Sequence, residues 1–212
     1  MVPSEVTLSD GSTITLREVR PDDKDGIAAG FAALSPESRY RRFFTAMNRL
    51  SAADLRYLTE VDHVDHEAVI GIAPEGGPVG VARYVRGDVR EEAEVAVAVA
   101  DAWQGKGAAT ALLERLVERA RENGIERFVA SVLQENAEAL ELFRSIAPDD
   151  PQPRRAVPGQ VALVILPPRD GVSVALLGRA LRRAAGGRVE IHPWRLIRER
   201  LQSLASESRP HR

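Results

Sequence analysis

The sequence contains no cysteine, and this absence excludes several kinds of chemistry. Disulfide scaffolds, thiol nucleophiles, iron–sulfur clusters and cysteine-ligated zinc all need the missing side chain. There is also no run of about 18 apolar residues, the length that a membrane-spanning helix requires. The N-terminal Met-Val-Pro-Ser-Glu lacks the basic and apolar regions of a secretory signal. We therefore expect a protein without a membrane span that stays in the cytoplasm.

The chain has almost no excess of one charge, because 29 Lys and Arg stand against 31 Asp and Glu. A balanced charge does not favour nucleic acid as a partner. The charge is nevertheless uneven along the sequence, since residues 171–212 carry nine arginines and three glutamates. We predict a main domain over residues 1–168 and an Arg-rich helical C-terminal extension over residues 169–212.

Alternating and apolar runs predict the strands. They lie at residues 5–8, 13–18, 68–72, 79–85, 95–100, 127–133 and 160–166. The first two flank Ser9-Asp10-Gly11-Ser12, whose Asp-Gly step favours a turn, so the fold is expected to open with a hairpin. The next three, joined by glycine-containing turns, predict an antiparallel meander.

Helical periodicity is clearest between Lys106 and Glu122. Its apolar positions are Ala109, Leu112, Leu113, Leu116, Val117 and Ala120. Shorter helices are predicted from Pro21 to about Leu34, after Ser35 through Phe44, after the Ser51 cap and over residues 136–146. A strand, helix, strand and helix therefore follow the meander.

The most informative segment is the strand at 95–100 and the Gly-rich turn that leads into the long helix. Small residues at 105, 107, 108 and 109 allow a ligand to approach the backbone closely. The N–H groups and the positive dipole end of a first helical turn favour a phosphate or pyrophosphate. The spacing fits neither a nucleoside triphosphatase loop nor a dinucleotide-binding loop. A different pyrophosphate-containing cofactor is indicated.

Gln104-Gly105-Lys106-Gly107-Ala108-Ala109 matches the Arg/Gln-x-x-Gly-x-Gly/Ala signature of acetyl-CoA binding, and here the chain resembles the GNAT superfamily of N-acetyltransferases. The resemblance covers roughly residues 4–166. It implies an α/β (α+β) fold, in which a mixed, mostly antiparallel central sheet of about six to seven strands carries helices on both faces. It also implies direct acyl transfer from acetyl-CoA as co-substrate to an amine, with no metal.

The resemblance assigns the cofactor to particular residues. The backbone of Val97, Ala98 and Val99 would pair with the pantetheine arm and the thioester carbonyl. The pyrophosphate would lie on the following loop, and Asn136 would contact the cofactor from the next helix. The loop residues are Gln104, Gly105, Lys106, Gly107, Ala108, Ala109 and Thr110.

Glu94 is the candidate catalytic base, because it interrupts a strand of Val and Ala and lies on the same face as Ala96 and Ala98. Partial burial there would raise its pKa toward the working pH, as deprotonation of an amine requires. The alternative is a solvated glutamate near a strand end.

Other candidates are weaker. Residues 62–67 include two histidines and three carboxylates, but too few histidines for a typical metal site. His63 or His66 stays open as an auxiliary base. Tyr40, Tyr57 and Tyr84 are expected to be core or rim aromatics.

Three segments are similar to the catalytic domain of Pat-type protein lysine acetyltransferases. They are Leu34 to Phe44, Leu58 to Asp62 and Ala93 to Val97. In that family the glutamate matching Glu94 is the proposed base. Arg41 and Arg42 would line the acceptor side or pair with acidic residues. The sequence departs from many GNAT relatives in having Leu142-Phe143 where a tyrosine acid is common, so water would protonate the thiolate.

Three functions remain open from the sequence. The favoured one is acetylation of a protein lysine. A second is acetylation of a small amine such as a polyamine, an amino acid or an antibiotic, and a third is a non-catalytic acyl-CoA sensor. The extension over 169–212 leaves open a homodimer or a protein partner that it contacts.

Overall fold

The computed structural model describes residues 1–34, 49–133, 154–155 and 160–165. The strands are β1 (Ser4–Thr7), β2 (Thr13–Glu18), β3 (His66–Ile72), β4 (Pro78–Arg86), β5 (Glu92–Val99), β6 (Arg127–Leu133), β7 (Arg154–Arg155) and β8 (Gln160–Ile165). The helices are η1 (Pro21–Asp23), α1 (Lys24–Ala33), α3 (Ala52–Thr59), η2 (Asp101–Trp103) and α4 (Ala108–Glu122). The predicted helices at 36–44 and 136–146, the boundary after residue 168 and the extension over 169–212 lie outside the described residues.

The strands form one mixed sheet in the order β1-β2-β3-β4-β5-β6-β8-β7. Its neighbours are antiparallel except for β5 and β6, which are parallel and are connected through α4. The predicted fold class is confirmed. The sheet has eight strands where about six to seven were expected, because β7, with two residues, is too short to produce an alternating pattern.

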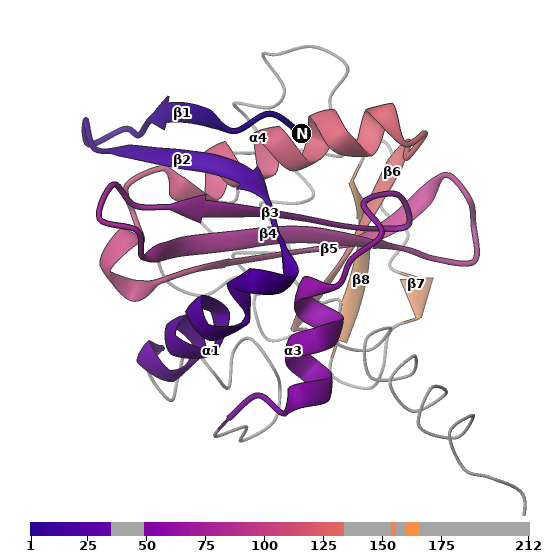
Figure 1. The fold of residues 1–212 in the computed structure, drawn as a ribbon. Coiled ribbons are helices and arrows are strands. Elements are labelled where there is room, and N and C mark those ends of the chain that lie inside the picture. Colours follow the sequence, from indigo (N-terminus) through magenta and orange to yellow (C-terminus); the bar gives the residue numbers. More distant parts are fainter. Residues whose placement is uncertain (35–48, 134–153, 156–159, 166–212) are drawn as a thin grey trace, which may run out of the picture.

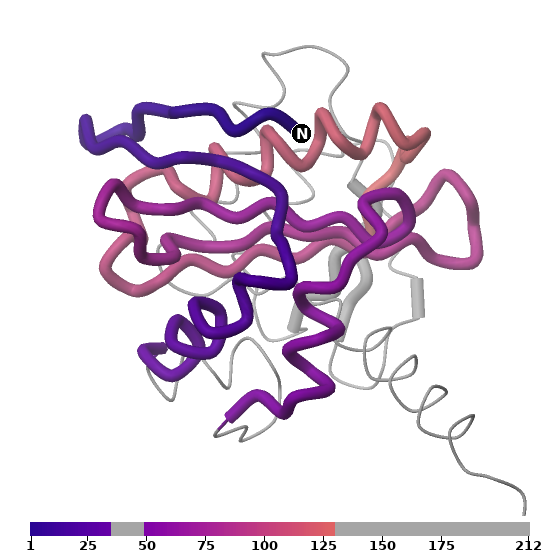
Figure 2. Tube along the Cα trace, in the orientation of Figure 1, coloured from indigo at the N-terminus to yellow at the C-terminus, as the bar shows by residue number. Residues whose placement is uncertain are grey.

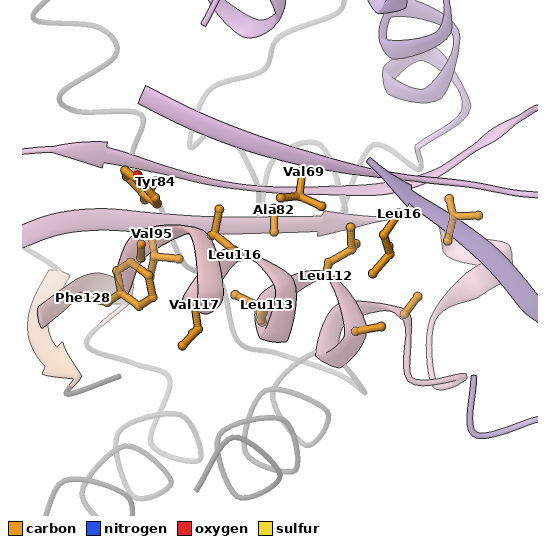
Figure 3. Packing of buried hydrophobic residues seen from close by; sticks show 14 of the residues in the cluster. Leu16, Val69, Ala82, Tyr84, Val95, Leu112, Leu113, Leu116, Val117 and Phe128 are labelled. Carbon is orange, nitrogen blue, oxygen red and sulfur yellow. The ribbon is translucent and has the colours of Figure 1, made fainter. Parts of the chain in front are cut away.

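Helices cover both faces of this sheet, as Figure 1 shows with α4 on one side and α1 and α3 on the other. The chain trace in Figure 2 shows the N-terminal hairpin, which forms one edge of the sheet, beside α4. The main core lies between α4 and the sheet, where alternate residues of β3, β4 and β5 meet the apolar face of the helix. Figure 3 shows Leu112, Leu116 and Val117 of α4 in this layer.

The described part of the chain contains no helix that is long and apolar enough to cross a membrane. The amphipathic α4 instead buries one face completely, with Leu112 and Leu116 at 0% exposure. Burial of each such leucine contributes about 1.5–3 kcal/mol to folding. This anchors the helix start, and with it the loop at residues 104–107, against the end of β5.

Candidate functional site

The parallel strands β5 and β6 separate at Glu94. Their described pairing runs from Glu92–Arg127 to Glu94–Val129 and ends there, although β5 continues to Val99. Exposure along β5 begins at Val97, beyond the point of separation. An extended ligand can bind along the edge of a strand through main-chain hydrogen bonds. The geometry therefore offers the end of β5 as a binding edge.

Glu94 is the residue of β5 at which this separation begins. The alternation of β5 sends Ala93 and Val95 into the core beneath α4, so that Glu94 and Ala96 are on the opposite face of the sheet. The side chain of Glu94 is only 8% exposed. The predicted base is thus a buried carboxylate at the point where the sheet opens.

A buried cation and a histidine share the face of Glu94. Arg83 on β4 is 2% exposed, and it occupies a position diagonal to Glu94, since it pairs with Ala96. Its guanidinium lies 3.2 Å from Nε2 of His66 and donates to the carbonyl of Leu58 at 3.3 Å. Sequence reasoning missed Arg83, although an arginine inside the apolar run of β4 was a visible signal.

The loop between β5 and α4 is a tight turn built on two glycines. Gly105 and Gly107 have φ angles of 75° and 95°, in the left-handed region that glycine adopts readily. The Gln104 side chain donates to the carbonyl of Val99 at 3.4 Å and to Asp101 at 3.1 Å. Gln104 therefore closes the turn back onto the end of β5.

The first turn of α4 carries the features of an anion site. Among the described residues no side chain caps this helix, and its first turn contains no acidic residue. The start of α3 is different, because Ser51 and Asp54 form a reciprocal capping box there. The N–H groups and the positive dipole end of this first turn are thus suited to an external anion.

The space around the loop also fits such a ligand. A Cβ atom placed on Gly105 would meet no atom within 4 Å, so the loop faces open space at that position. Gly107 and the following three residues are buried against the core, whereas Gln104 and Gly105 are exposed. The structure brings the predicted residues of β5 and of the loop into one continuous strip. Asn136, the remaining predicted contact, lies outside the described residues.

The histidine and carboxylate cluster at residues 62–67 is divided between the two faces of the sheet. Asp62 organises the loop, because its Oδ1 accepts N–H bonds from Val64, Asp65 and His66 at 2.8–2.9 Å. Burial opposes ionisation of Asp62, but these three donors outweigh it and lower the pKa of the carboxyl. His66 lies in the same cross-strand row as Glu94, with Val85 between them.

Glu67 lies on the other face, under α4. One of its oxygens is 2.7 Å from Nδ1 of His63, and the other accepts from Nε of Arg119 at 2.9 Å. Ligand atoms of Glu18, His63 and Glu67 lie within 4.8 Å of one another, which is a spacing that a metal ion could use. Arg119 already bridges the carboxylates of Glu18 and Glu67, so a side chain of the protein balances the negative charge of this group.

Comparisons with known proteins agree with this geometry. The model of the acetyltransferase (GNAT) family matches residues 33–146, more than half of the chain. The acetyltransferase Pat of Mycolicibacterium smegmatis is 38% identical over 140 residues, which are 64% of this chain and 41% of Pat. An acetyltransferase of Pseudomonas aeruginosa is 31% identical over 124 residues, covering 57% of this chain and 67% of that protein. The chain thus matches less than half of the length of the mycobacterial relative.

The fold comparison gives the same result. The GNAT domain of the S. lividans protein PAT superposes with a TM-score of 0.67 at 35% sequence identity, and covers 77% of this chain and 96% of that domain. The match of the family model to residues 33–146 shows that the chain belongs to the acetyltransferase (GNAT) family.

Proposed function

We propose that the protein is an acetyl-CoA-dependent N-acetyltransferase that transfers an acetyl group directly to a primary amine. The observation that carries this proposal is the separation of β5 from β6 at a buried glutamate, beside an α4 start that no described side chain caps. A strand edge, a carboxylate and an anion loop are therefore adjacent along the chain. Binding of acetyl-CoA and deprotonation of the acceptor amine require these three features.

The cofactor fits the residues of this strip. We propose that the backbone of Val97, Ala98 and Val99 pairs with the pantetheine arm. The loop from Gln104 to Thr110 would hold the pyrophosphate through backbone N–H groups, and Asn136 would add a contact. Bound acetyl-CoA supplies an acetyl thioester at the point where the strands separate. We further propose that residues 1–168 carry the reaction and that residues 169–212 form a separate extension.

Glu94 is proposed to accept the proton of the attacking amine. Burial of its carboxylate excludes competing water. Glu94 also lies where β5 and β6 separate, next to the strand edge that would hold the thioester. The amine nitrogen then forms the new bond to the acetyl carbon, and the bond from that carbon to sulfur breaks. A water molecule protonates the departing thiolate, because Leu142-Phe143 stand where many relatives have a tyrosine.

A protein lysine is the proposed acceptor. Support comes from the two Pat proteins, at 38% and 35% identity, whose matching part includes the segment around Glu94. A small amine acceptor would instead require a closed pocket. A sensor without activity would bind acetyl-CoA without turnover across a broad panel of acceptors. Acetylation of lysine-containing peptides, compared with polyamines and amino acids, separates these alternatives.

The cofactor site is tested by placing charge on Gly105. Asp and Asn both tolerate its left-handed conformation better than other side chains do, and the position faces open space. We expect Gly105→Asp to bind acetyl-CoA at least about tenfold more weakly than the isosteric Gly105→Asn, because only Asp repels the pyrophosphate. Isothermal titration calorimetry measures this. Absence of binding by the wild type would overturn the proposed function.

The role of Glu94 is tested with Glu94→Gln. We expect kcat to fall by about 100-fold or more, with the Kd for acetyl-CoA changed less than about twofold, since a general base acts on the amine and not on the cofactor. Glu92→Gln is the matched control, because Glu92 lies on the same strand and face but bonds to Arg127 at 3.0 Å. Full activity in Glu94→Gln would remove Glu94 from the mechanism.

A further inference from the structure

The turn of the N-terminal hairpin contacts the cofactor loop directly. The hydroxyl of Ser9 donates to the carbonyl oxygen of Lys106 at 2.7 Å, and the backbone N–H of Ser9 donates to the same oxygen at 2.9 Å. These residues are 97 positions apart in the sequence. The hairpin turn thus forms part of the support of a loop that belongs to another segment of the chain.

The two bonds fix the direction of one peptide group. In a trans peptide the carbonyl and the following N–H point in opposite directions. Because Ser9 holds the Lys106 carbonyl toward the hairpin, the N–H of Gly107 must point away from it. This peptide group immediately precedes α4, so its orientation decides where the N–H of the helix cap is directed.

The glycines on either side make such a support necessary. Gly105 and Gly107 both reach the left-handed region without penalty, so a Gly-Lys-Gly loop has more than one accessible orientation of its peptide groups. The contact is also close, since a Cβ atom on Gly107 would lie 3.1 Å from the Ser9 hydroxyl. The requirement for glycine at 107 therefore comes partly from the hairpin.

A second link joins the same two segments. Hydrogen bonds from the side chain and backbone of Ser12 lower the pKa of Asp10, whose carboxylate lies 3.7 Å from Nζ of Lys106. The ammonium of Lys106 also lies 4.9 Å from the centre of the Trp103 ring. The side chain of Lys106 is thus held between the hairpin turn and the end of η2.

We propose that Ser9 is a positioning residue of the cofactor site, which fixes the anion-binding loop in the orientation that receives a pyrophosphate. This inference rests on the proposed function, because it assigns the pyrophosphate of acetyl-CoA to the loop. It adds the N-terminal hairpin turn to the site. Ser9 does not itself contact the cofactor, and its effect passes through the Lys106–Gly107 peptide.

The test compares Ser9→Ala with Ser12→Ala. Both variants remove one hydroxyl from the same exposed turn. Ser12→Ala leaves both Ser9 donors to the Lys106 carbonyl in place, and the backbone N–H of Ser12 still donates to Asp10 at 3.0 Å, which keeps that carboxylate beside Lys106. Calorimetry is carried out with acetyl-CoA and with S-acetylpantetheine, which lacks the pyrophosphate. We expect Ser9→Ala to bind acetyl-CoA about three- to tenfold more weakly than Ser12→Ala, with no difference for S-acetylpantetheine. Ser9→Thr, which keeps the hydroxyl, should restore binding.

The outcomes are distinguishable. Equal acetyl-CoA affinity in Ser9→Ala and Ser12→Ala, with a wild type that binds, overturns the role of Ser9 and leaves the proposed function intact. An equal loss for both ligands in Ser9→Ala also overturns it, because the effect would then be general and not specific to the pyrophosphate. A wild type that binds neither ligand overturns the proposed function itself.

Discussion

At the scale of single residues, Gly80 on β4 sets how closely β4 and β5 approach each other near Ala98 and Val99, at the end of β5. A Cβ atom there would lie 2.5 Å from the carbonyl oxygen of Ala98 and 3.0 Å from a methyl of Leu112. Real side chains are not found at such a distance from a backbone oxygen, so the strand would have to shift. Gly80 thus matters to the site although it lies outside every motif that the sequence displays.

We expect Gly80→Ala to lower the free energy of unfolding by about 1–3 kcal/mol, as overpacking does in a dense core. The resulting shift of β5 should also weaken acetyl-CoA binding, which titration calorimetry measures. Gly77→Ala is the matched control, since its Cβ would meet no atom within 4 Å. Urea denaturation followed by circular dichroism measures the free energy of unfolding of both variants. Equal stability of the two variants would contradict this account of Gly80.

At the scale of elements, the apolar face of α4 and its first turn have different roles. Its apolar face, including Leu112 and Leu116, packs on the sheet, and its first turn presents backbone N–H groups beside the end of β5. The first role was visible in the spacing of the leucines. The second followed from the glycines of the preceding loop, because only small residues permit close approach of a ligand.

Some elements could not be derived from the sequence with the right bounds. β3 was predicted from residue 68 but begins at His66, because polar residues at a strand start resemble a loop. Asp62 and Glu67 were grouped as one cluster, yet the strand alternation sends His66 and Glu67 to opposite faces. Prediction from local pattern fails here, since the partners of these side chains lie on α4 and β4.

At the scale of the whole molecule, a polar junction ties β4, the loop before β3 and the end of α4. The Tyr84 hydroxyl donates to the carbonyl of Val64 at 3.0 Å and accepts from Nδ2 of Asn123 at 2.7 Å. The same amide of Asn123 donates to the carbonyl of His63 at 2.9 Å. These bonds join segments up to 60 residues apart, so their loss would affect global stability.

Burial raises the pKa of Tyr84 to about 12, above the value near 10 of an unfolded tyrosine. The unfolded state therefore releases this proton first, and the stability contributed by Tyr84, complete below pH 10, is lost progressively toward pH 12. At pH 8 we expect Tyr84→Phe to be less stable than the wild type by about 1–3 kcal/mol.

This difference should stay constant up to about pH 10 and shrink from there toward about pH 12, and denaturation of both proteins across that range measures it. Tyr57→Phe serves as the control, because it retains Tyr84 and should follow the wild type in its pH dependence. A gap between wild type and Tyr84→Phe that stays constant up to pH 11.5 would contradict the raised pKa.

The sequence alone determined most strand and helix positions, and it singled out Glu94 and the Gly-rich turn before α4 as candidate site residues. The fold class was implied by the resemblance to the GNAT superfamily. The element positions and the candidate residues follow from local rules, namely hydrophobic period, turn chemistry and the small residues that backbone binding of a ligand needs. Only the tertiary structure decided that β5 and β6 separate at Glu94, that Arg83 and His66 share its face, and that Ser9 supports the loop. Such facts join positions that are distant in the chain, and pairing between strands and across a turn leaves no periodic signal in one segment.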